Sequence, residues 1–293
     1  MAFSGMIWTR RMALSGGAAL LAGCTRLGAL NGVNAITPGD GGTDKIASDI
    51  AFGTDPRQAL DVYAPETGAK LPVIVFFYGG SWSSGARGDY EFAARALAAQ
   101  GFVVVVPDYR LVPQVRYPAF IEDGAAALAW TVANIAQYRG DPARIAVSGH
   151  SAGAYIAAML ALEPRWLAAH TLPPTSIKAL AALAGPFDFA PFKPGGAADQ
   201  AFGAAPDIAA TQPITHARSD APPLLLMTGD ADETVLPRNS TALAAKVTGL
   251  GGQAKVITYP GIGHIGIILA LSKPFRGKAP AVADMTAFLK ATI

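Results

Sequence analysis

The chain has 293 residues, of which 51% are hydrophobic and 15% carry charge. This composition excludes a disordered chain and predicts a large buried core in a single domain. The formal net charge is +2, and no block of lysine or arginine extends beyond Arg10-Arg11, so nucleic acid is not an expected partner.

Residues 1–24 have the order of an export signal, with Arg10-Arg11, a short apolar segment and then Leu-Ala-Gly before Cys24. The apolar segment is too short to span a membrane permanently. The arginine pair resembles a twin-arginine signal, and residues 21–24 resemble a bacterial lipobox, whose cysteine is lipidated. We therefore expect export to the periplasm or cell envelope, with Cys24 as the lipid anchor to a membrane surface. The alternative is a cleaved signal with a chance cysteine.

Residues 25–44 are rich in Gly, Asn, Thr and Pro and have no apolar period, which predicts a flexible tether. Residues 45–293 are expected to form one domain. It begins with two runs, Ile46–Phe52 and Ala59–Ala64, that flank a Gly-Thr-Asp-Pro turn and predict an antiparallel hairpin.

Continuous apolar runs follow, which is typical of strands covered on both faces. They are Leu71–Phe77, Phe102–Val106, Ile145–Val147, Ile177–Leu183, Pro223–Met227 and Ala254–Tyr259. Helical patterns lie between them at Tyr90–Ala99, in the stretch that Pro118 begins, and at Ala154–Leu162, Ser240–Leu250 and Val282–Leu289. This alternation predicts a mostly parallel α/β sheet between helical layers, with the hairpin as an antiparallel edge.

The strongest motif joins an apolar run to a helical stretch through Gly149-His150-Ser151-Ala152-Gly153. In such a strand–turn–helix, the central serine hydroxyl is exposed at the carboxyl end of the strand, and the flanking glycines avoid collisions with neighbouring backbone. Gly-x-Ser-x-Gly alone also occurs in ordinary turns, so its context carries the prediction. Ser151 is the candidate nucleophile.

A serine hydroxyl becomes a good nucleophile when a histidine, held by a carboxylate, takes its proton. His264 follows the last predicted strand and is the candidate base. His150 lies inside the serine turn, where its side chain is expected to point away from Ser151. His170 and His216 have no strand before them.

The carboxylate that orients the base is expected just after the strand at 223–227, where three acidic residues compete. Asp230 could merely cap the turn, and Glu233 is expected to face solvent. We favour Asp232 and keep Asp230 as the alternative. The order along the chain is then Ser, Asp, His.

Backbone amides are expected to stabilise the negative charge that develops on the substrate oxygen. The amide of Ala152 is the first candidate, because it starts the helix after the nucleophile. The Gly-rich turn after the strand at 71–77 supplies the amides of Gly80 and Ser81. The alternative is an ordinary Gly-Gly turn.

From about Ile46 onward, the chain resembles the α/β-hydrolase superfamily, and specifically the esterase branch related to hormone-sensitive lipase and to the small BD-FAE and kynurenine formamidase-like enzymes. The matching segments are Tyr78–Trp82 for the family's His-Gly-Gly-x-Trp, Pro107–Leu111, Gly149–Gly153, Gly229-x-x-Asp232-x-x-Val235, and His264. The resemblance implies the α/β-hydrolase fold and hydrolysis of carboxylic esters without a cofactor.

The chain departs from the family pattern at Tyr78, where the family usually has His, and at Ser81, where many members have Gly. In the family that histidine supports the loop, a role that a tyrosine hydroxyl could also serve. We expect Asp108, Arg110 and Asp123 to take part in a structural ion network that braces these loops.

The expected function is a serine hydrolase that acts on small carboxylic esters. The stretch 187–221 is too short for a separate cap domain, which favours short acyl groups over triglycerides. The sequence has no His-Glu-x-x-His pair, cysteine cluster or phosphate-binding motif, so no metal or cofactor is expected. Two alternatives stay open: an arylformamidase-like amide hydrolase, and a lipoprotein that binds a ligand on the same fold without turnover. The sequence does not predict the oligomeric state.

Overall fold

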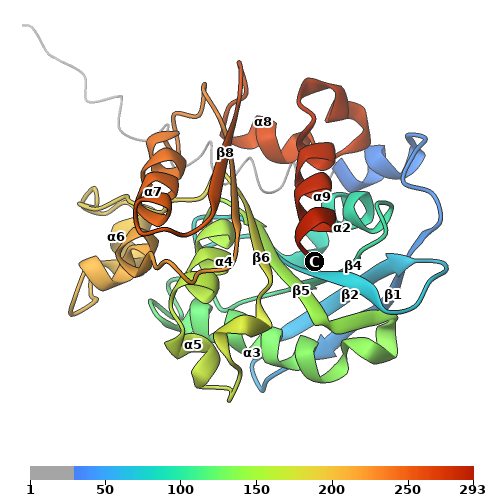
Figure 1. The fold of residues 1–293 in the computed structure, drawn as a ribbon, viewed down its shortest axis with the longest axis horizontal. Helices are drawn as coiled ribbons and strands as arrows, with labels where there is room; N and C mark the ends of the chain where they lie inside the picture. Colours follow the sequence, from blue (N-terminus) through green and yellow to red (C-terminus); the bar gives the residue numbers. More distant parts are fainter. Residues whose placement is uncertain (1–29) are drawn as a thin grey trace, which may run out of the picture.

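The described part of the chain, residues 30–293 of a computed structural model, folds around one eight-stranded sheet (Figure 1). The strands are β1 (Thr43–Ala51), β2 (Ala59–Pro65), β3 (Leu71–Phe77), β4 (Val103–Pro107), β5 (Gly140–His150), β6 (Ala179–Leu183), β7 (Leu224–Gly229) and β8 (Ala254–Tyr259). Their order is β1-β2-β4-β3-β5-β6-β7-β8. β2 pairs antiparallel with both β1 and β4, and the other neighbours are parallel. The predicted mostly parallel sheet with an antiparallel N-terminal pair is confirmed.

Helices cover both faces of this sheet, because the parallel connections cross over it. The α-helices are α2 (Glu91–Ala98), α3 (Ala119–Asn134), α4 (Ala152–Leu162), α5 (Arg165–Ala168), α6 (Ala197–Phe202), α7 (Arg238–Gly249), α8 (His264–Leu269) and α9 (Ala281–Thr292). The 3-10 helices are η1 (Arg87–Tyr90), η2 (Ile135–Tyr138), η3 (Pro174–Ser176), η4 (Ala209–Thr211), η5 (Pro213–His216) and η6 (Lys273–Lys278). α2 and α9 pack together on one face, while α3, α4 and α7 pack on the other.

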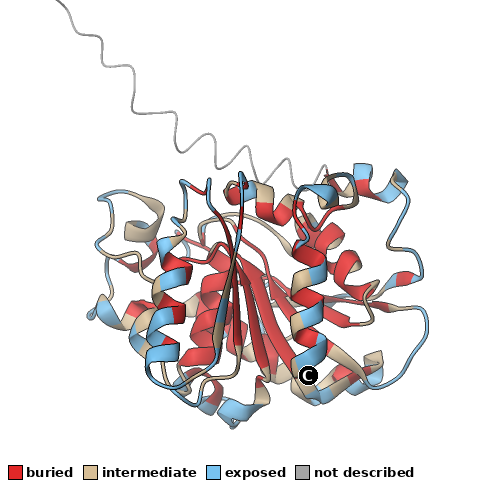
Figure 2. Ribbon diagram, turned by 45° about the horizontal axis from the view of Figure 1, so that its top comes forward, coloured by how far each residue is buried: buried red, intermediate tan, exposed pale blue. Residues whose placement is uncertain are grey.

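The core follows from the continuous apolar strands. Every residue of β4, β6 and β7 is buried, as expected for strands with helices on both faces (Figure 2). The edge strands β1 and β8 are only partly buried and carry more polar residues. β5, the strand that leads into Ser151, lies inside the sheet between β3 and β6.

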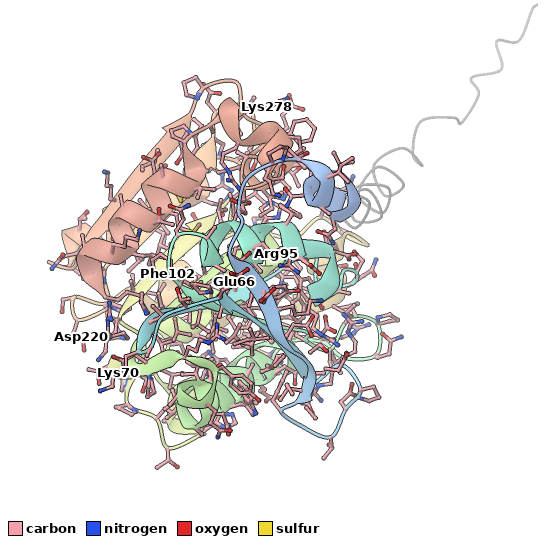
Figure 3. All side chains as sticks on the ribbon, turned by 90° about the vertical axis from the view of Figure 1, so that its right-hand side faces the viewer. Glu66, Lys70, Arg95, Phe102, Asp220 and Lys278 are labelled. Atoms are coloured by element: carbon pink, nitrogen blue, oxygen red, sulfur yellow. The ribbon has the colours of Figure 1, made fainter. Side chains whose placement is uncertain are left out.

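The segment before β1 is packed on the body of the protein. Residues 30–36 are helical and lie beside α2 and the segment that ends at Lys278 (Figure 3). The Asn31 side-chain oxygen accepts a hydrogen bond from the Phe92 amide at 3.1 Å, and the Asn34 oxygen accepts one from the Lys273 amide at 2.8 Å.

The packing of residues 30–36 differs from the flexible tether that the sequence predicted over residues 25–44, of which residues 25–29 lie outside the described part of the chain. Asparagine is common in loops, which led to the prediction of a tether. Here the Asn31 and Asn34 side chains accept hydrogen bonds from backbone amides at the starts of neighbouring helices. Composition alone does not separate these two uses. The predicted export signal and Cys24 lie outside the described residues.

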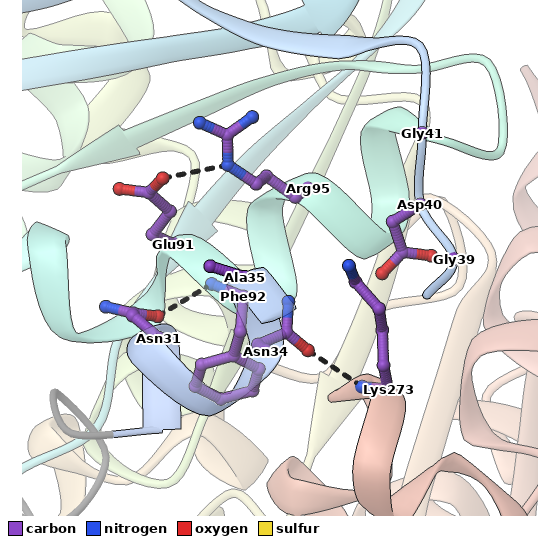
Figure 4. Close-up of a pocket in the computed structure, with 10 residues that line it drawn as sticks. All are labelled: Asn31, Asn34, Ala35, Gly39, Asp40, Gly41, Glu91, Phe92, Arg95 and Lys273. Atoms are coloured by element: carbon purple, nitrogen blue, oxygen red, sulfur yellow. Dashed lines mark hydrogen bonds and ion pairs between the residues drawn. The ribbon is translucent and has the colours of Figure 1, made fainter. Parts of the chain in front are cut away.

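A pocket of about 370 Å³ lies where this N-terminal segment meets α2 and η6 (Figure 4). Its lining residues are Asn31, Asn34, Ala35, Gly39, Asp40, Gly41, Glu91, Phe92, Arg95 and Lys273. The charged groups in it already have partners. Arg95 Nε donates to Glu91 at 2.8 Å, Lys273 Nζ donates to the Thr37 carbonyl at 2.6 Å, and Asp40 pairs with Arg276 at 2.6 Å. None of the candidate catalytic residues lines it.

Candidate active site

Ser151 occupies a tight turn between the last residue of β5 and the first residue of α4. Its backbone has φ 55° and ψ −120°, a conformation that is costly for a residue with a side chain. The Ser151 amide donates to the Leu183 carbonyl at 2.9 Å, which ties the turn to β6. A Cβ on Gly153 would lie 2.1 Å from the Phe77 carbonyl oxygen, so only glycine fits there. The expected strand–turn–helix is present.

The structure brings Ser151, His264 and Asp232 together at the carboxyl edge of the sheet. His264 Nε2 lies 2.9 Å from Ser151 Oγ, and His264 Nδ1 lies 2.8 Å from Asp232 Oδ2. A carboxylate only accepts hydrogen bonds, so Nδ1 carries the proton and Nε2 is left to accept from the serine hydroxyl. This is the geometry of a nucleophile, a base and a group that orients the base.

Asp232 is buried and held by backbone as well as by His264. Its Oδ1 accepts from the amides of Thr234 at 2.9 Å and Val235 at 2.8 Å. Burial disfavours the charged form, but the hydrogen bond to His264, its charge and the two amides outweigh that effect and lower the pKa of Asp232. The carboxylate therefore stays ionised beside the imidazole.

The competing residues have other contacts. Asp230 is exposed, and its Oδ1 accepts from the Gly261 amide at 2.6 Å, which fixes the turn after β8. Glu233 and His170 are exposed. His216 pairs with Glu163, away from the serine turn, with Nδ1 2.6 Å from the carboxylate oxygen.

In the turn after β3, three successive residues have positive φ angles. Gly80, Ser81 and Trp82 have φ values of 144°, 54° and 59°. Within residues 30–293, the amides of Gly80 and Ser81 donate to no protein acceptor, and Ala152 begins α4, where the first amides have no intrahelical acceptor. These three amides are thus available to a substrate oxygen.

Tyr78, which replaces the family's histidine, is bound by an arginine that sequence reasoning missed. Arg57 Nη2 donates to the Tyr78 hydroxyl at 2.6 Å and to the Gly85 carbonyl at 2.7 Å, and its Nε donates to the Tyr109 carbonyl at 2.8 Å. Burial raises the pKa of Tyr78, so the hydroxyl stays neutral and accepts. One guanidinium therefore holds both ends of the turn and the loop after β4.

The residues of the expected ion network fall into two groups, one around Asp108 and one around Asp123. Asp108 Oδ1 accepts from the Arg87 amide at 2.7 Å, and its other oxygen pairs with the Arg87 guanidinium. Asp123 pairs with Arg110 at 2.8 Å. All three residues make ion pairs, as predicted, but Asp108 and Arg110 share no partner among the described residues, because Asp108 pairs with Arg87 and, at 3.9 Å, with Arg57.

An aromatic cluster lies beside the nucleophile helix and the turn after β3. The Trp82 ring packs edge-on against Phe202 with centroids 4.8 Å apart and against Tyr155 at 5.4 Å, and it stacks on Phe189 at 6.0 Å. Tyr155 is one helical turn after Ser151. Phe189 and Phe202 come from the 187–221 stretch, which therefore contributes an aromatic wall and no separate domain.

Residues 30–293 contain neither a metal-binding cluster nor a membrane-spanning helix. No group of three or more His, Cys, Asp or Glu side chains there is placed to hold a metal ion. In the same part of the chain, every helix is too short or too polar to cross a bilayer.

A family model described as BD-FAE matches residues 60–247. The chain belongs to the BD-FAE family. Among curated proteins, it is 30% identical to esterase LipC of Mycobacterium tuberculosis over 73% of this chain and 58% of LipC. It is 28% identical to the isoprenylcysteine alpha-carbonyl methylesterase ICME of Arabidopsis thaliana over 82% of this chain and 61% of ICME. The chain thus spans about 60% of the length of these two relatives.

Solved structures resemble this BD-FAE chain over nearly all of its length. Esterase B from Lactobacillus rhamnosis superimposes with a TM-score of 0.78 at 20% identity, covering 94% of each chain. An esterase from Pyrobaculum calidifontis gives a TM-score of 0.74 at 23% identity, covering 94% of this chain and 93% of the other. At such identities the likeness concerns the fold, and it confirms the predicted α/β-hydrolase fold.

Proposed function

We propose that this BD-FAE chain is a serine hydrolase that cleaves small carboxylic esters. The observation that carries the proposal is the pair of short distances at His264, 2.9 Å to Ser151 Oγ and 2.8 Å to the buried Asp232. Two relatives favour ester bonds over formamides, because LipC is an esterase and ICME is a methylesterase.

In the proposed reaction, His264 takes the proton of Ser151 while the serine oxygen bonds to the ester carbonyl carbon. The amides of Ala152, Gly80 and Ser81 donate to the resulting oxyanion. His264 then gives its proton to the departing alcohol, which leaves an acyl group on Ser151. Water, deprotonated by His264, attacks this acyl group, and the acid and free serine are released.

Electrostatics favour this sequence of proton transfers. The imidazole becomes positively charged when it takes the serine proton, and the ionised Asp232 at 2.8 Å stabilises that charge. The two amides that bind Asp232 keep it from turning away. No cofactor is needed for these steps.

We also propose a preference for short acyl groups. Trp82, Phe189 and Phe202 interdigitate beside the oxyanion turn, and Trp82 and Phe202 are fully or almost fully buried. Such packing leaves little apolar surface for an extended acyl chain. Rates on p-nitrophenyl acetate and butyrate are therefore expected to exceed the rate on the palmitate ester, and faster palmitate hydrolysis would contradict this preference.

The proposed ester hydrolysis is tested with p-nitrophenyl acetate and a panel of aryl formamides. Ser151→Ala is expected to lower kcat by about a millionfold, because no other side chain replaces the nucleophile. Ser148→Ala is the matched control, since the Ser148 hydroxyl donates to the Ala181 carbonyl inside the sheet. Substantial turnover by Ser151→Ala would refute the mechanism. Turnover of formamides in place of esters would favour the amide hydrolase. Binding of either substrate without any turnover would favour a binding protein.

We further propose export and lipid attachment at Cys24. The support is the residue order in 1–24, from the arginine pair to Leu-Ala-Gly-Cys. Metabolic labelling with a palmitate analogue is expected to mark the wild type and not Cys24→Ala. Equal labelling of both would exclude the anchor.

A further inference from the structure

We infer that two buried residues, Tyr90 and His150, position the oxyanion turn and the base relative to each other. The inference rests on the proposed function. His150 Nε2 lies 3.0 Å from the backbone oxygen of His264, and His150 Nδ1 lies 3.2 Å from the Tyr90 hydroxyl. The Tyr90 hydroxyl in turn accepts from the Gly79 amide at 3.1 Å. A continuous chain of hydrogen bonds thus joins the residue before Gly80 to the base residue itself.

Only one arrangement of protons satisfies all three bonds. A carbonyl oxygen cannot donate, so His150 Nε2 must carry the hydrogen that binds His264. The Nδ1 of a neutral imidazole then accepts, so the Tyr90 hydroxyl donates to it. The lone pairs of that hydroxyl remain for the Gly79 amide. Each of these hydrogen-bonding groups can therefore act only as the donor or only as the acceptor described. These bonds hold the His150 and Tyr90 rings in one orientation.

The His150 ring remains neutral while the base titrates. Burial, and next the positive charge of His264 when protonated, lower the pKa of His150 to about 3. The groups that face this ring are the Tyr90 hydroxyl and the His264 ring and carbonyl. The His264 carbonyl and the nearby charge of Asp232 favour protonation of His150, but burial outweighs them. The hydrogen-bond chain therefore keeps the same direction across the pH range of catalysis.

Packing sets the spacing that these hydrogen bonds hold. A Cβ on Gly79 would lie 2.9 Å from His150 Nδ1 and 3.1 Å from the Ser151 Cβ, so the oxyanion turn rests directly on both side chains. The His150 and His264 rings lie 4.9 Å apart at 38°. His150 thus fills the space between the turn and the base, and its thickness determines their separation.

Neither residue touches the reacting atoms, so they act as positioning residues. Without the Tyr90 hydroxyl, the Gly79 amide and His150 Nδ1 lose their common partner and the turn can shift. Misplacement of the oxyanion amides weakens transition-state binding more than substrate binding. We expect Tyr90→Phe to lower kcat about 10-fold to 100-fold with KM within about twofold.

The matched control is Tyr259→Phe. Tyr259 is also buried, and its hydroxyl makes one hydrogen bond, to Asp284 at 2.8 Å, away from the oxyanion turn. Both variants are expected to lose similar stability in a thermal melt, while only Tyr90→Phe loses kcat. Equal kcat in the two variants would overturn the inference.

A second variant tests whether the two residues act through one chain. His150→Gln keeps an amide nitrogen that can reach the His264 carbonyl but lacks the rigid ring that holds an acceptor against the Tyr90 hydroxyl. If Tyr90 and His150 act together, the Tyr90→Phe/His150→Gln double variant loses little more kcat than the worse single variant. Losses that multiply would overturn the inference. If the wild type itself fails to hydrolyse esters, or if Ser151→Ala retains activity, the proposed function fails and not this inference alone.

Discussion

The two sides of the proposed active site are held in different ways. On the acid–base side, the carboxylate of Asp232 is bound by amides two and three residues further along the chain. On the oxyanion side, the turn has local bonds to the Gly80 carbonyl and also partners 11 to 31 residues away, as with Tyr90 on Gly79 and Tyr109 on Tyr78. Local backbone thus fixes the acid, whereas tertiary packing fixes the turn. A mutation on the oxyanion side should therefore act through geometry, and one on the acid–base side through charge.

Among the residues that hold the base or the turn in place, the largest effect is expected at Asp232. Asp232→Asn removes the charge and favours the wrong tautomer of His264, so kcat should fall by about 10⁴-fold. Asp230→Asn is the control, since Asp230 only binds the Gly261 amide, and it should change kcat by about threefold or less. Steady-state kinetics on p-nitrophenyl acetate measure both. Similar losses in the two variants would show that the acid has been assigned wrongly.

A smaller effect is expected at Arg57. Arg57→Gln removes the guanidinium that binds Tyr78, Gly85 and Tyr109. Because the amides of the turn lose alignment, kcat should fall about 10-fold with a smaller change in KM. Arg116→Gln is the control at an exposed arginine. A change in KM alone would mean that Arg57 contacts substrate and does not align the turn.

The smallest effect concerns stability and pH. The pKa of His150 falls from its ordinary 6.5 to about 3 on folding, because the ring is buried beside His264. As the pH falls, His150 therefore binds a proton in the unfolded chain at a higher pH than in the folded chain. The free energy of unfolding should decrease as pH falls from about 6.5 toward 3. Urea unfolding of His150→Gln should show a shallower decrease than the wild type. Equal slopes would show that His150 does not remain neutral in the folded protein.

Local patterns predicted most of the fold and the candidate triad. The apolar runs at Leu71–Phe77 and Ala254–Tyr259 coincide with β3 and β8. Ser151 and His264 could be chosen because each follows a strand whose carboxyl end must lie at one edge of the sheet. Their meeting at 2.9 Å is a consequence of that topology.

Contacts between distant segments were not predictable in the same way. No sequence pattern near Tyr78 predicts its contact with Arg57, which lies 21 residues earlier in the chain. Arg57 lies near the Tyr78 hydroxyl because of the way β2 and β3 are arranged in the sheet. The sequence predicted that the His150 side chain points away from Ser151, but it did not predict that the His150 ring packs on the His264 ring. The pairing of Asp108 with Arg87 was missed for the same reason.

The central claim is that Ser151 is an activated nucleophile, and covalent labelling tests it most directly. A fluorophosphonate probe, read by mass spectrometry of the intact protein and its peptides, should add one equivalent at Ser151. Labelling should be lost in Ser151→Ala and in His264→Gln, and it should persist in Ser148→Ala. A folded wild-type protein that stays unlabelled, or that carries the adduct on another residue, would contradict the account.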